Sequence, residues 1–238
     1  AKHYQVYAKM PGQIALEKSG GGGSTTPTVF VNFTKTEQRW CLCVTDSDRL
    51  HPTANMDNTA MKCKGIADDN SIVAAHTDLA AREIENILPI AFLAEVIPPT
   101  HHDQWGWHIN RLNRLRHDVH SYCDIKRGTT LRKIRSYSDS SPSRIYWENV
   151  VKDLEKAAAL TADCVSLDEC KQGNELPCQC YVGYGFGEKV LESVVRKLDC
   201  RTPQQSEKMI RHDSNRREWM NVGCTVFEWC CAPQKTRL

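Results

Sequence analysis

An apolar run that ends in two carboxylates constrains the fold of this chain more than any other feature. Residues 40–44 read Trp-Cys-Leu-Cys-Val, and Asp46 and Asp48 follow them closely. A short continuous apolar run is typical of a buried strand in a parallel sheet. If the strand continues through Asp48, both carboxylates point the same way, at the edge where open α/β folds place their chemistry. The run therefore predicts an α/β fold with an acidic site at that edge.

The acidic pair has the chemistry of a site for a hard cation. Carboxylate oxygens suit Mg²⁺ or Mn²⁺, which keep several waters and accept phosphate oxygens as further ligands. Two acidic residues so close together are also typical of a solvated loop or a helix cap. The pair alone does not decide between these interpretations.

A more specific pattern follows the acidic pair. A second strand-like run at 72–75 precedes an Arg-Glu-Ile-Glu-Asn segment at 82–86, and an Asp-Ile-Lys-Arg-Gly turn stands at 124–128. This order resembles the Toprim nuclease domain, particularly the versions in bacterial anti-phage proteins and in overcoming-lysogenization-defect nucleases. The resemblance covers residues 40–128 and implies an α/β core with a mainly parallel sheet flanked by helices.

The resemblance also implies an activity, that of a metal-dependent nuclease in anti-phage defence. Asp46 and Asp48 would bind Mg²⁺ or Mn²⁺ and take part in catalysis, and Glu83 or Glu85 would complete the metal site. On an ideal helix the two glutamates lie about 200° apart, so only one of them is expected to face the metal. Lys126 would stabilise charge on the scissile phosphate.

A catalytic glutamate at the end of an opening strand is a further implication of the resemblance. The strand-like run most similar to that opening strand, 28–31, is followed by Asn32. Glu17 is the preferred replacement, as general acid or base, and Glu37 is the second choice. The short interval between Glu17 and Asp46 leaves little room for the helix that normally joins the first two strands.

Basic residues are concentrated in the middle of the chain, although the net charge is only +2. Between Arg111 and Arg135 they are opposed only by Asp118 and Asp124. Such a stretch is either a contact surface for nucleic-acid phosphates, DNA or RNA, or a solvated helix face. The expected phosphate contacts are Arg49, Arg82, Arg127, Arg132, Lys133 and Arg135.

The rest of the chain suggests two parts. Residues 1–135 are expected to form the Toprim-like core, with a flexible Gly-rich segment at 19–24, and 136–238 a mainly helical, cysteine-rich appendage with helices near 146–160 and 188–198. Cys41 and Cys43 are expected to pack inside the first strand. The spacing of Cys164, Cys170, Cys178 and Cys180 does not match paired zinc knuckles, and zinc binding stays open.

The chain lacks an apolar stretch of about 18 residues, a signal-peptide pattern and a P-loop. A cytoplasmic location without membrane contact is therefore expected. By the resemblance, regulation would come from a partner such as a defence ATPase or a retron complex, and a homo-oligomer is possible.

Three alternatives remain. The first is a binding or structural subunit of a defence complex with a degenerate Toprim fold, which Asn32 suggests. The second is a phosphatase of the haloacid-dehalogenase type, which also uses an Asp-x-Asp pair but expects Thr or Val where Leu50 stands. The third is a Toprim topoisomerase or primase, for which the chain is short.

Overall fold

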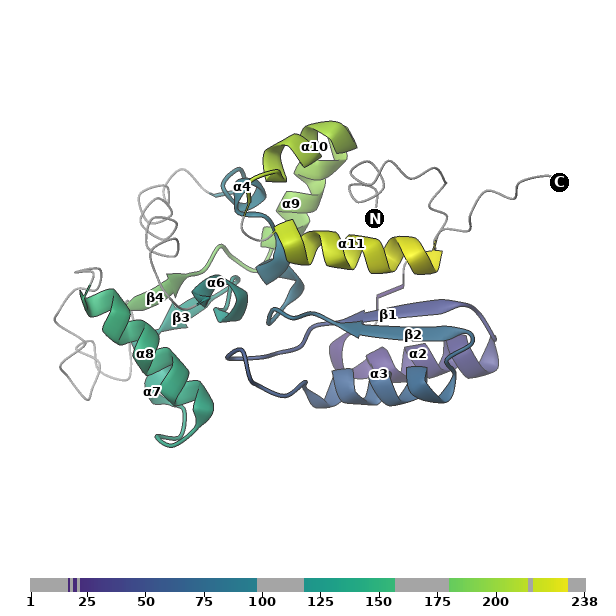
Figure 1. Ribbon diagram of the computed structural model, residues 1–238, viewed down its shortest axis with the longest axis horizontal. Helices are drawn as coiled ribbons and strands as arrows, with labels where there is room; N and C mark the ends of the chain where they lie inside the picture. The colour runs from purple at the N-terminus through teal and green to yellow at the C-terminus, as the bar shows by residue number, and fades with distance from the viewer. Residues whose placement is uncertain are drawn as a thin grey trace. The chain divides into compact units, whose positions relative to one another are not determined.

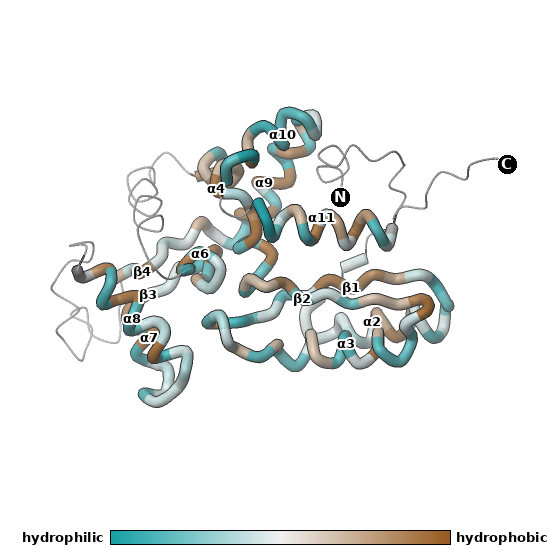
Figure 2. Tube along the Cα trace, in the orientation of Figure 1, coloured by the Kyte–Doolittle hydropathy of each residue, from teal (hydrophilic) through white to brown (hydrophobic). Residues whose placement is uncertain are grey.

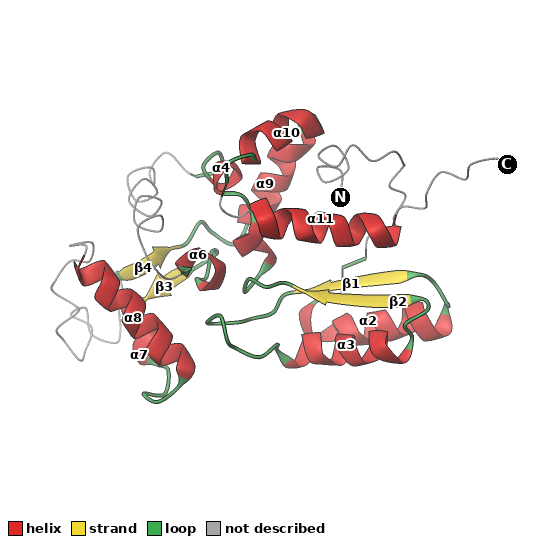
Figure 3. Cartoon of the chain, in the orientation of Figure 1, coloured by secondary structure: helices red, strands yellow, loops and turns green. Residues whose placement is uncertain are grey.

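The chain folds as a mixed α/β protein (Figures 1 and 3). The computed structural model describes residues 17, 19–20, 22–97, 118–156, 180–213 and 216–230. Contacts between residues divide the chain into two compact units. The first unit comprises 1–48, 55–92 and 196–238, and the second comprises 49–54 and 93–195. The domain boundary expected at residue 135 falls inside the second unit.

The first unit contains a pair of parallel strands with helices around it. Its elements are the 3₁₀ helix η1 (Gly23–Thr25), α2 (Thr26–Val31), the π-helical turn η2 (Asn32–Thr36), β1 (Cys41–Thr45), α3 (Asn58–Asp69), β2 (Ala74–Asp78), the 3₁₀ helix η3 (Ile84–Ile87), α10 (Pro203–Ile210) and α11 (Arg216–Cys230). Two further helices cross from one unit to the other, α4 (Ile90–Leu93) and α9 (Val190–Asp199).

The predicted first strand is confirmed. The strands β1 and β2 pair in parallel, with Cys41 opposite Ala74 and Thr45 opposite Asp78. Their carboxyl ends therefore lie at the same edge, as a right-handed crossover through α3 would arrange them. The second strand begins two residues later than expected, because the amides of Val73 and Ala74 both bind Asn70 O in a turn.

Apolar side chains cover both faces of the strand pair. On one face Phe30 of α2 and Cys63 and Ala67 of α3 form a buried cluster with Cys43 and Ala74. On the other face Val44 packs with Trp219 and Val222 of α11 around Leu79, Ala81 and Ile87. Figure 1 shows these layers, with α2 and α3 on one side of the strands and α11 on the other. The expectation that Cys41 and Cys43 are packing residues is confirmed.

Two helices of the first unit show why they form where they do. The helix α3 begins after Asp57, whose carboxylate accepts the Ala60 amide at 2.7 Å as an N-cap. Its buried residues Ala60, Cys63 and Ala67 recur at intervals of three and four, which is the helical period. Along α11 hydrophobic and hydrophilic stretches also follow one another, as expected of a helix with one buried face (Figure 2).

The expectation of a strand at 28–31 is wrong. Residues Thr26–Val31 form α2, with Pro27 in its first turn. Proline has a fixed φ and no amide proton, so it suits the first turn of a helix and gives the chain a starting point there. Phe30 is then buried against α3 rather than in a strand. Residues 13–16, which precede Glu17, lie outside the described residues.

The second unit is built around an antiparallel strand pair. Its elements are α6 (Val119–Tyr122), β3 (Gly128–Thr130), α7 (Leu131–Arg135), α8 (Pro142–Lys156) and β4 (Tyr181–Tyr184). The strands β3 and β4 pair with Gly128 opposite Tyr184. Trp147 of α8 is buried and donates its indole N–H to Leu50 O at 2.9 Å. The helix expected near 146–160 is confirmed as far as Lys156, and that expected near 188–198 corresponds to α9.

Within the described ranges, none of the helices combines the length and the apolar character that a membrane crossing requires.

Candidate functional site at the carboxyl ends of the parallel strands

The segment after β1 is tied to the segment after β2 by backbone hydrogen bonds. The amides of Ser47 and Asp48 donate to Arg82 O at 3.1 and 2.9 Å, and Ser47 Oγ donates to Ala81 O at 2.7 Å. Asp48 has a positive φ of 51°, which turns the chain out of the strand direction. The strand thus ends at Thr45, and hydrogen bonds rather than strand alternation set the positions of Asp46 and Asp48.

The 3₁₀ helix η3 brings two glutamates to the same place. Glu83 is its N-cap residue and forms a capping box with Asn86, whose Oδ1 accepts the Glu83 amide at 3.0 Å. The next amide, that of Ile84, donates to Asp46 Oδ1 at 2.9 Å. Asp46, Asp48, Glu83 and Glu85 are called the acidic edge below. Glu83 and Glu85 are buried, whereas Asp46 and Asp48 are exposed.

The four carboxylates of the acidic edge influence one another electrostatically. Loss of hydration, assisted by the charges of Glu85, Glu83 and Asp48, raises the pKa of the Asp46 carboxyl to about 6. The hydrogen bond from the Ile84 amide opposes these effects, because it stabilises the ionised form. Although Asp46 as a residue is exposed, its carboxyl therefore lies among enough protein atoms and negative charge to hold a proton more tightly than usual.

Both glutamates contribute to this field, although an ideal α-helix would turn one of them away. Glu83 lies before the helix in extended backbone, and only Glu85 is inside it. The 200° separation of an α-helix therefore does not apply. Arg82 Nε lies 3.3 Å from Glu83 Oε1 in a largely buried ion pair, which offsets part of the negative charge. Arg82, expected to contact substrate phosphate, thus contacts a carboxylate of its own unit.

The acidic edge is not already arranged as a coordination shell. Among the described residues, no group of three or more His, Cys, Asp or Glu side chains is placed so that it could hold a metal ion. The structure brings Asp46, Asp48, Glu83 and Glu85 within electrostatic reach, but their oxygens do not converge on one point. A cation would have to draw them together or keep several of its waters.

The structure does not bring Glu17 to the acidic edge. The exposed Glu17 carboxylate binds Arg39, which precedes β1, whereas Asp46 follows it. The five residues of β1 span about 17 Å, since a strand rises ~3.3 Å per residue. The Glu17 carboxylate is thus held beside Arg39, before β1, and not beside Asp46. Asn32 and Glu37 also lie before β1, where Asn32 Nδ2 donates to Glu37 Oε1 at 2.8 Å.

The other predicted phosphate contacts belong to the second unit. Arg49 lies in this unit, and so does Lys126, the residue expected to stabilise charge on the scissile phosphate. Lys126 lies in the turn before β3. Arg127 Nε lies 2.7 Å from Glu188 Oε1 in an exposed ion pair. Arg132, Lys133 and Arg135 lie on α7, where Lys133 Nζ stacks over the Tyr137 ring at 5.7 Å from its centre. Of the remaining candidates, Arg111, Arg114, Arg116, Cys164, Cys170 and Cys178 lie outside the described residues.

Sequence reasoning missed the groups that hold the acidic edge in place. These are the Arg82 carbonyl, the Ile84 amide and the Asn86 side chain. The sequence did contain a signal for the Asn86 side chain, because an acidic residue followed three positions later by Asn is compatible with a capping box. The backbone groups carry no signal in the sequence.

Comparison of the chain with protein-family models, with curated proteins and with solved structures finds no match.

Proposed function

We propose that the acidic edge binds a divalent cation, Mg²⁺ or Mn²⁺, and that the protein is a nuclease of the Toprim type that hydrolyses phosphodiester bonds. The observation that supports this proposal is the electrostatic coupling of four carboxylates where two parallel strands end. Loss of hydration together with this coupling raises the pKa of the Asp46 carboxyl to about 6. Clustered negative charge of this kind raises the free energy of the folded state, and such clusters are typical of functional sites.

The donor set suits a hard cation. All four side chains offer carboxylate oxygens, and a divalent cation would relieve the repulsion that now favours a proton on Asp46. Asp46 and Asp48 are the exposed pair and would hold the ion, with Glu85 and Glu83 behind them. When bound, such a cation supplies Lewis acidity toward a phosphate oxygen and lowers the pKa of a bound water.

The protein's own groups would orient the nucleic acid. In the proposal Lys126 stabilises charge on the phosphate, and the basic residues Arg49, Arg127, Arg132, Lys133 and Arg135 neutralise the backbone. Arg82 would hold the Glu83 carboxylate in position through their ion pair. We also propose that the protein is a Toprim-like defence effector in the cytoplasm and that a partner ATPase or a retron complex regulates it.

The test combines cation binding with cleavage. We expect Mn²⁺ to bind the full chain in a calorimetric titration, and Mn²⁺ or Mg²⁺ to support cleavage of labelled single- and double-stranded DNA and RNA. Asp46→Asn should abolish both, because it removes one charge from the centre of the acidic edge. Asp69→Asn is the matched control, since Asp69 is an exposed carboxylate on α3 of the same unit.

Cleavage that persists in EDTA, or an Asp69→Asn variant as impaired as Asp46→Asn, would contradict the proposal. Loss of Mn²⁺ binding in both variants would also contradict the proposal, because binding would then depend on the overall charge of the protein and not on a specific site.

A second candidate is a binding subunit with a Toprim-like core that does not cleave. The position of Glu17 favours it, because this carboxylate pairs with Arg39 at the other end of β1. This candidate predicts nucleic-acid binding that is unchanged by Asp46→Asn, together with no cleavage by the wild-type chain in either metal. The same assay therefore separates the two.

A further inference from the structure

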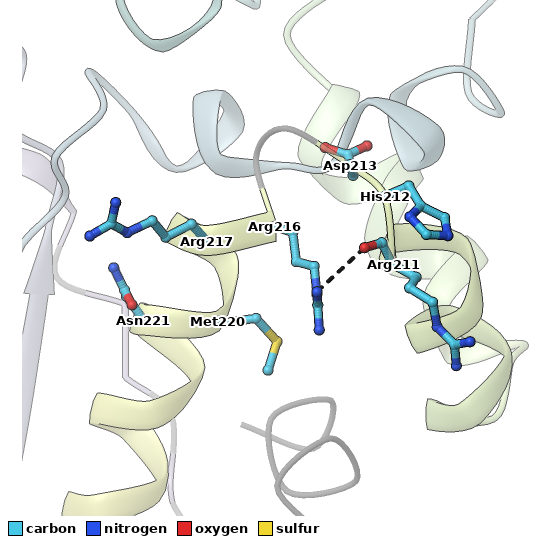
Figure 4. Close-up of a pocket in the computed structure, with 7 residues that line it drawn as sticks. All are labelled: Arg211, His212, Asp213, Arg216, Arg217, Met220 and Asn221. Atoms are coloured by element: carbon cyan, nitrogen blue, oxygen red, sulfur yellow. Dashed lines mark hydrogen bonds between the residues drawn. The ribbon is translucent and has the colours of Figure 1, made fainter.

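A cavity of about 450 Å³ lies in the first unit between the end of α10 and the start of α11, and Arg211, Arg216 and Arg217 contribute to its wall. Arg216 and Arg217 leave α11 on opposite sides (Figure 4), so their guanidinium groups do not converge on one ligand. The second unit carries a surface with a more definite chemistry, in which two tyrosine rings of β4 lie beside basic residues.

A bulge in the strand pair β3–β4 brings the two tyrosines to one face. Gly128 pairs with Tyr184 and Thr130 with Tyr181, so β4 has one residue more than β3 between the paired positions. Side chains three positions apart in a regular strand lie on opposite faces, and one bulged residue places them on the same face. Val182, the extra residue, is buried, whereas both tyrosines are half-buried. Tyr181 and Tyr184 are called the tyrosine pair below.

The rings of the tyrosine pair pack against each other. Their centres are 4.9 Å apart and their planes differ by 32°, which is close to an offset stack. The Tyr181 ring also covers Gly128, since a Cβ built on Gly128 would lie 2.9 Å from Tyr181 Cε1. The glycine thus leaves room for the ring to lie against the strand. The two rings form a short, ordered stack that a further planar group can extend.

Two basic residues lie next to one end of the tyrosine pair. The turn that contains Lys126 and Arg127 packs against Gly185, the residue directly after Tyr184. A Cβ built on Gly185 would lie 2.6 Å from Lys126 O and 2.4 Å from Arg127 C. Arg127 also forms an ion pair with Glu188 at 2.7 Å, but both side chains are exposed and solvent screens this pair.

The other end of the tyrosine pair meets α7. The amide of Leu131, the first residue of α7, donates to Cys180 O at 3.0 Å, directly before Tyr181. The basic residues of α7 are Arg132, Lys133 and Arg135. Basic residues therefore flank the tyrosine pair at both ends. Aromatic rings combined with positive charge are what proteins use to hold single-stranded nucleic acid.

We infer that the tyrosine pair stacks with unpaired bases of single-stranded DNA or RNA. Every base has a planar π face that can extend the stack of rings, while the flanking basic residues neutralise phosphates on each side. In a duplex the faces of the internal bases are covered by their neighbours, so these bases cannot reach the rings. The inference rests on the proposed contact of nucleic acid with the second unit, but it does not require cleavage at the acidic edge.

The experiment measures the fluorescence anisotropy of labelled strands that bind the full chain in EDTA. The probes are single-stranded DNA and RNA of one sequence, the same strands with abasic sites at their centre, and the DNA duplex. The phosphates are the same with and without abasic sites, so a difference in affinity reports contacts with the bases. Wild type should bind the base-bearing strand about ten-fold more tightly than the abasic strand.

The variant Tyr181→Leu with Tyr184→Leu should lose this difference of about ten-fold, and its affinity for the abasic strand and the duplex should change by less than about two-fold. The conservative variant Tyr181→Phe with Tyr184→Phe keeps the rings and should retain the difference. The matched control is Trp40→Leu, which removes an exposed aromatic ring from the first unit and should also retain it.

Equal binding of base-bearing and abasic strands by wild type overturns the inference, and so does a Trp40→Leu variant as impaired as the double Leu variant. If the double Leu variant is unfolded, photochemical cross-linking of wild type to a strand that carries iodouracil decides. The cross-link should fall in the peptide that contains Tyr181 and Tyr184, and its absence there overturns the inference.

The probes also identify the strand, because a preference for bases in DNA alone or in RNA alone assigns the tyrosine pair to that nucleic acid. Asp46→Asn should leave the preference for bases unchanged. Base stacking without cleavage would refute only the proposed nuclease, and metal-dependent cleavage without a preference for bases would refute only this inference.

Discussion

At the scale of single residues, Asp46 shows how an exposed carboxylate acquires an unusual proton affinity. Its Oδ1 accepts the Ile84 amide, which favours the ionised form, but lost hydration and three neighbouring carboxylates outweigh that bond. Loss of hydration is the largest of these effects, and the buried neighbours Glu83 and Glu85 add to it, because charges inside the protein are screened less than charges in water.

This environment predicts how stability depends on pH. The folded-state pKa of Asp46, about 6, exceeds the ~3.9 of an unfolded Asp. Between these values the folded state binds the extra proton, so the free energy of unfolding falls as pH rises through 6. Asp46→Asn removes this dependence and should stabilise the protein at pH 7.5 relative to wild type, by about 1 kcal/mol after solvent screening of an exposed group.

Urea unfolding of wild type and Asp46→Asn at pH 5 and pH 7.5 measures this difference. The difference between the two proteins at each pH cancels the contribution of titrating groups that do not interact with Asp46. The variant Asp69→Asn should show no pH-dependent difference from wild type. A gain for Asp46→Asn that is larger at pH 5 than at pH 7.5 would mean that the sign of the pKa shift is wrong.

At the scale of elements, the strand pair β3–β4 depends on glycines that allow close backbone approach. A Cβ at Gly185, just after β4, would lie 2.4 Å from the Arg127 carbonyl carbon and 2.6 Å from Gly128 N. Both are backbone atoms, so the clash cannot be relieved by rotating a side chain. The backbone of the turn 125–127 and the backbone just after β4 therefore pack so closely that no side chain fits between them.

Gly185→Ala should destabilise the protein by about 2 kcal/mol, because overpacking against backbone forces the strands apart. Gly65→Ala is a control of the same chemistry, since a Cβ at Gly65 meets no atom within 4 Å and this residue lies inside α3. That control should stabilise the protein by about 0.5–1 kcal/mol. Denaturant midpoints with unchanged m-values provide the measurement, and equal effects of the two substitutions would refute the packing argument.

The elements also show what a sequence can and cannot predict. The first strand was predictable because residues 40–44 are continuously apolar and are followed by polar residues, which is typical of a strand in a parallel sheet. The run at 28–31 is too short for periodicity to separate strand from helix, and Pro27 was the better signal. The start of β2 was misplaced because the turn at Asn70 is stabilised by backbone groups, which no side-chain pattern reveals.

At the scale of the whole molecule, charge is divided between the two compact units. The carboxylates of the acidic edge belong to the first unit, whereas Lys126, Arg127 and the three basic residues of α7 belong to the second. The composition of these groups could be read from the sequence. Their assignment to separate units could not, because it depends on which long-range contacts form.

The basic residues of α7 give a test of nucleic-acid binding. Replacing Lys133 and Arg135 by Glu should weaken binding to all sequences alike, because phosphate contacts carry no base information. If each residue neutralises one phosphate, the slope of log K against log salt concentration should become shallower by about 2. Lys133 is exposed and both residues lie in the last turn of a short helix, so the fold should tolerate the change.

Fluorescence anisotropy at several salt concentrations measures the slope. The control is Lys152→Glu with Lys189→Glu, which reverses two exposed charges of the second unit that are not on α7. An unchanged slope in the α7 variant, or the same change in the control, would identify the α7 side chains as an ordinary solvated face.

The hydrogen bonds between the loop after β1 and the start of η3 have a consequence for amide exchange with solvent. The Ile84 amide and the Asp46 carboxylate that accepts it are 38 positions apart in the chain, and the amides of Ser47 and Asp48 bind the Arg82 carbonyl beside it. These three protons should exchange when the two segments separate, and they should then share one protection factor. Each such opening also disperses the four carboxylates, so the protection factor of the Ile84 amide reports the free energy of opening of the acidic edge.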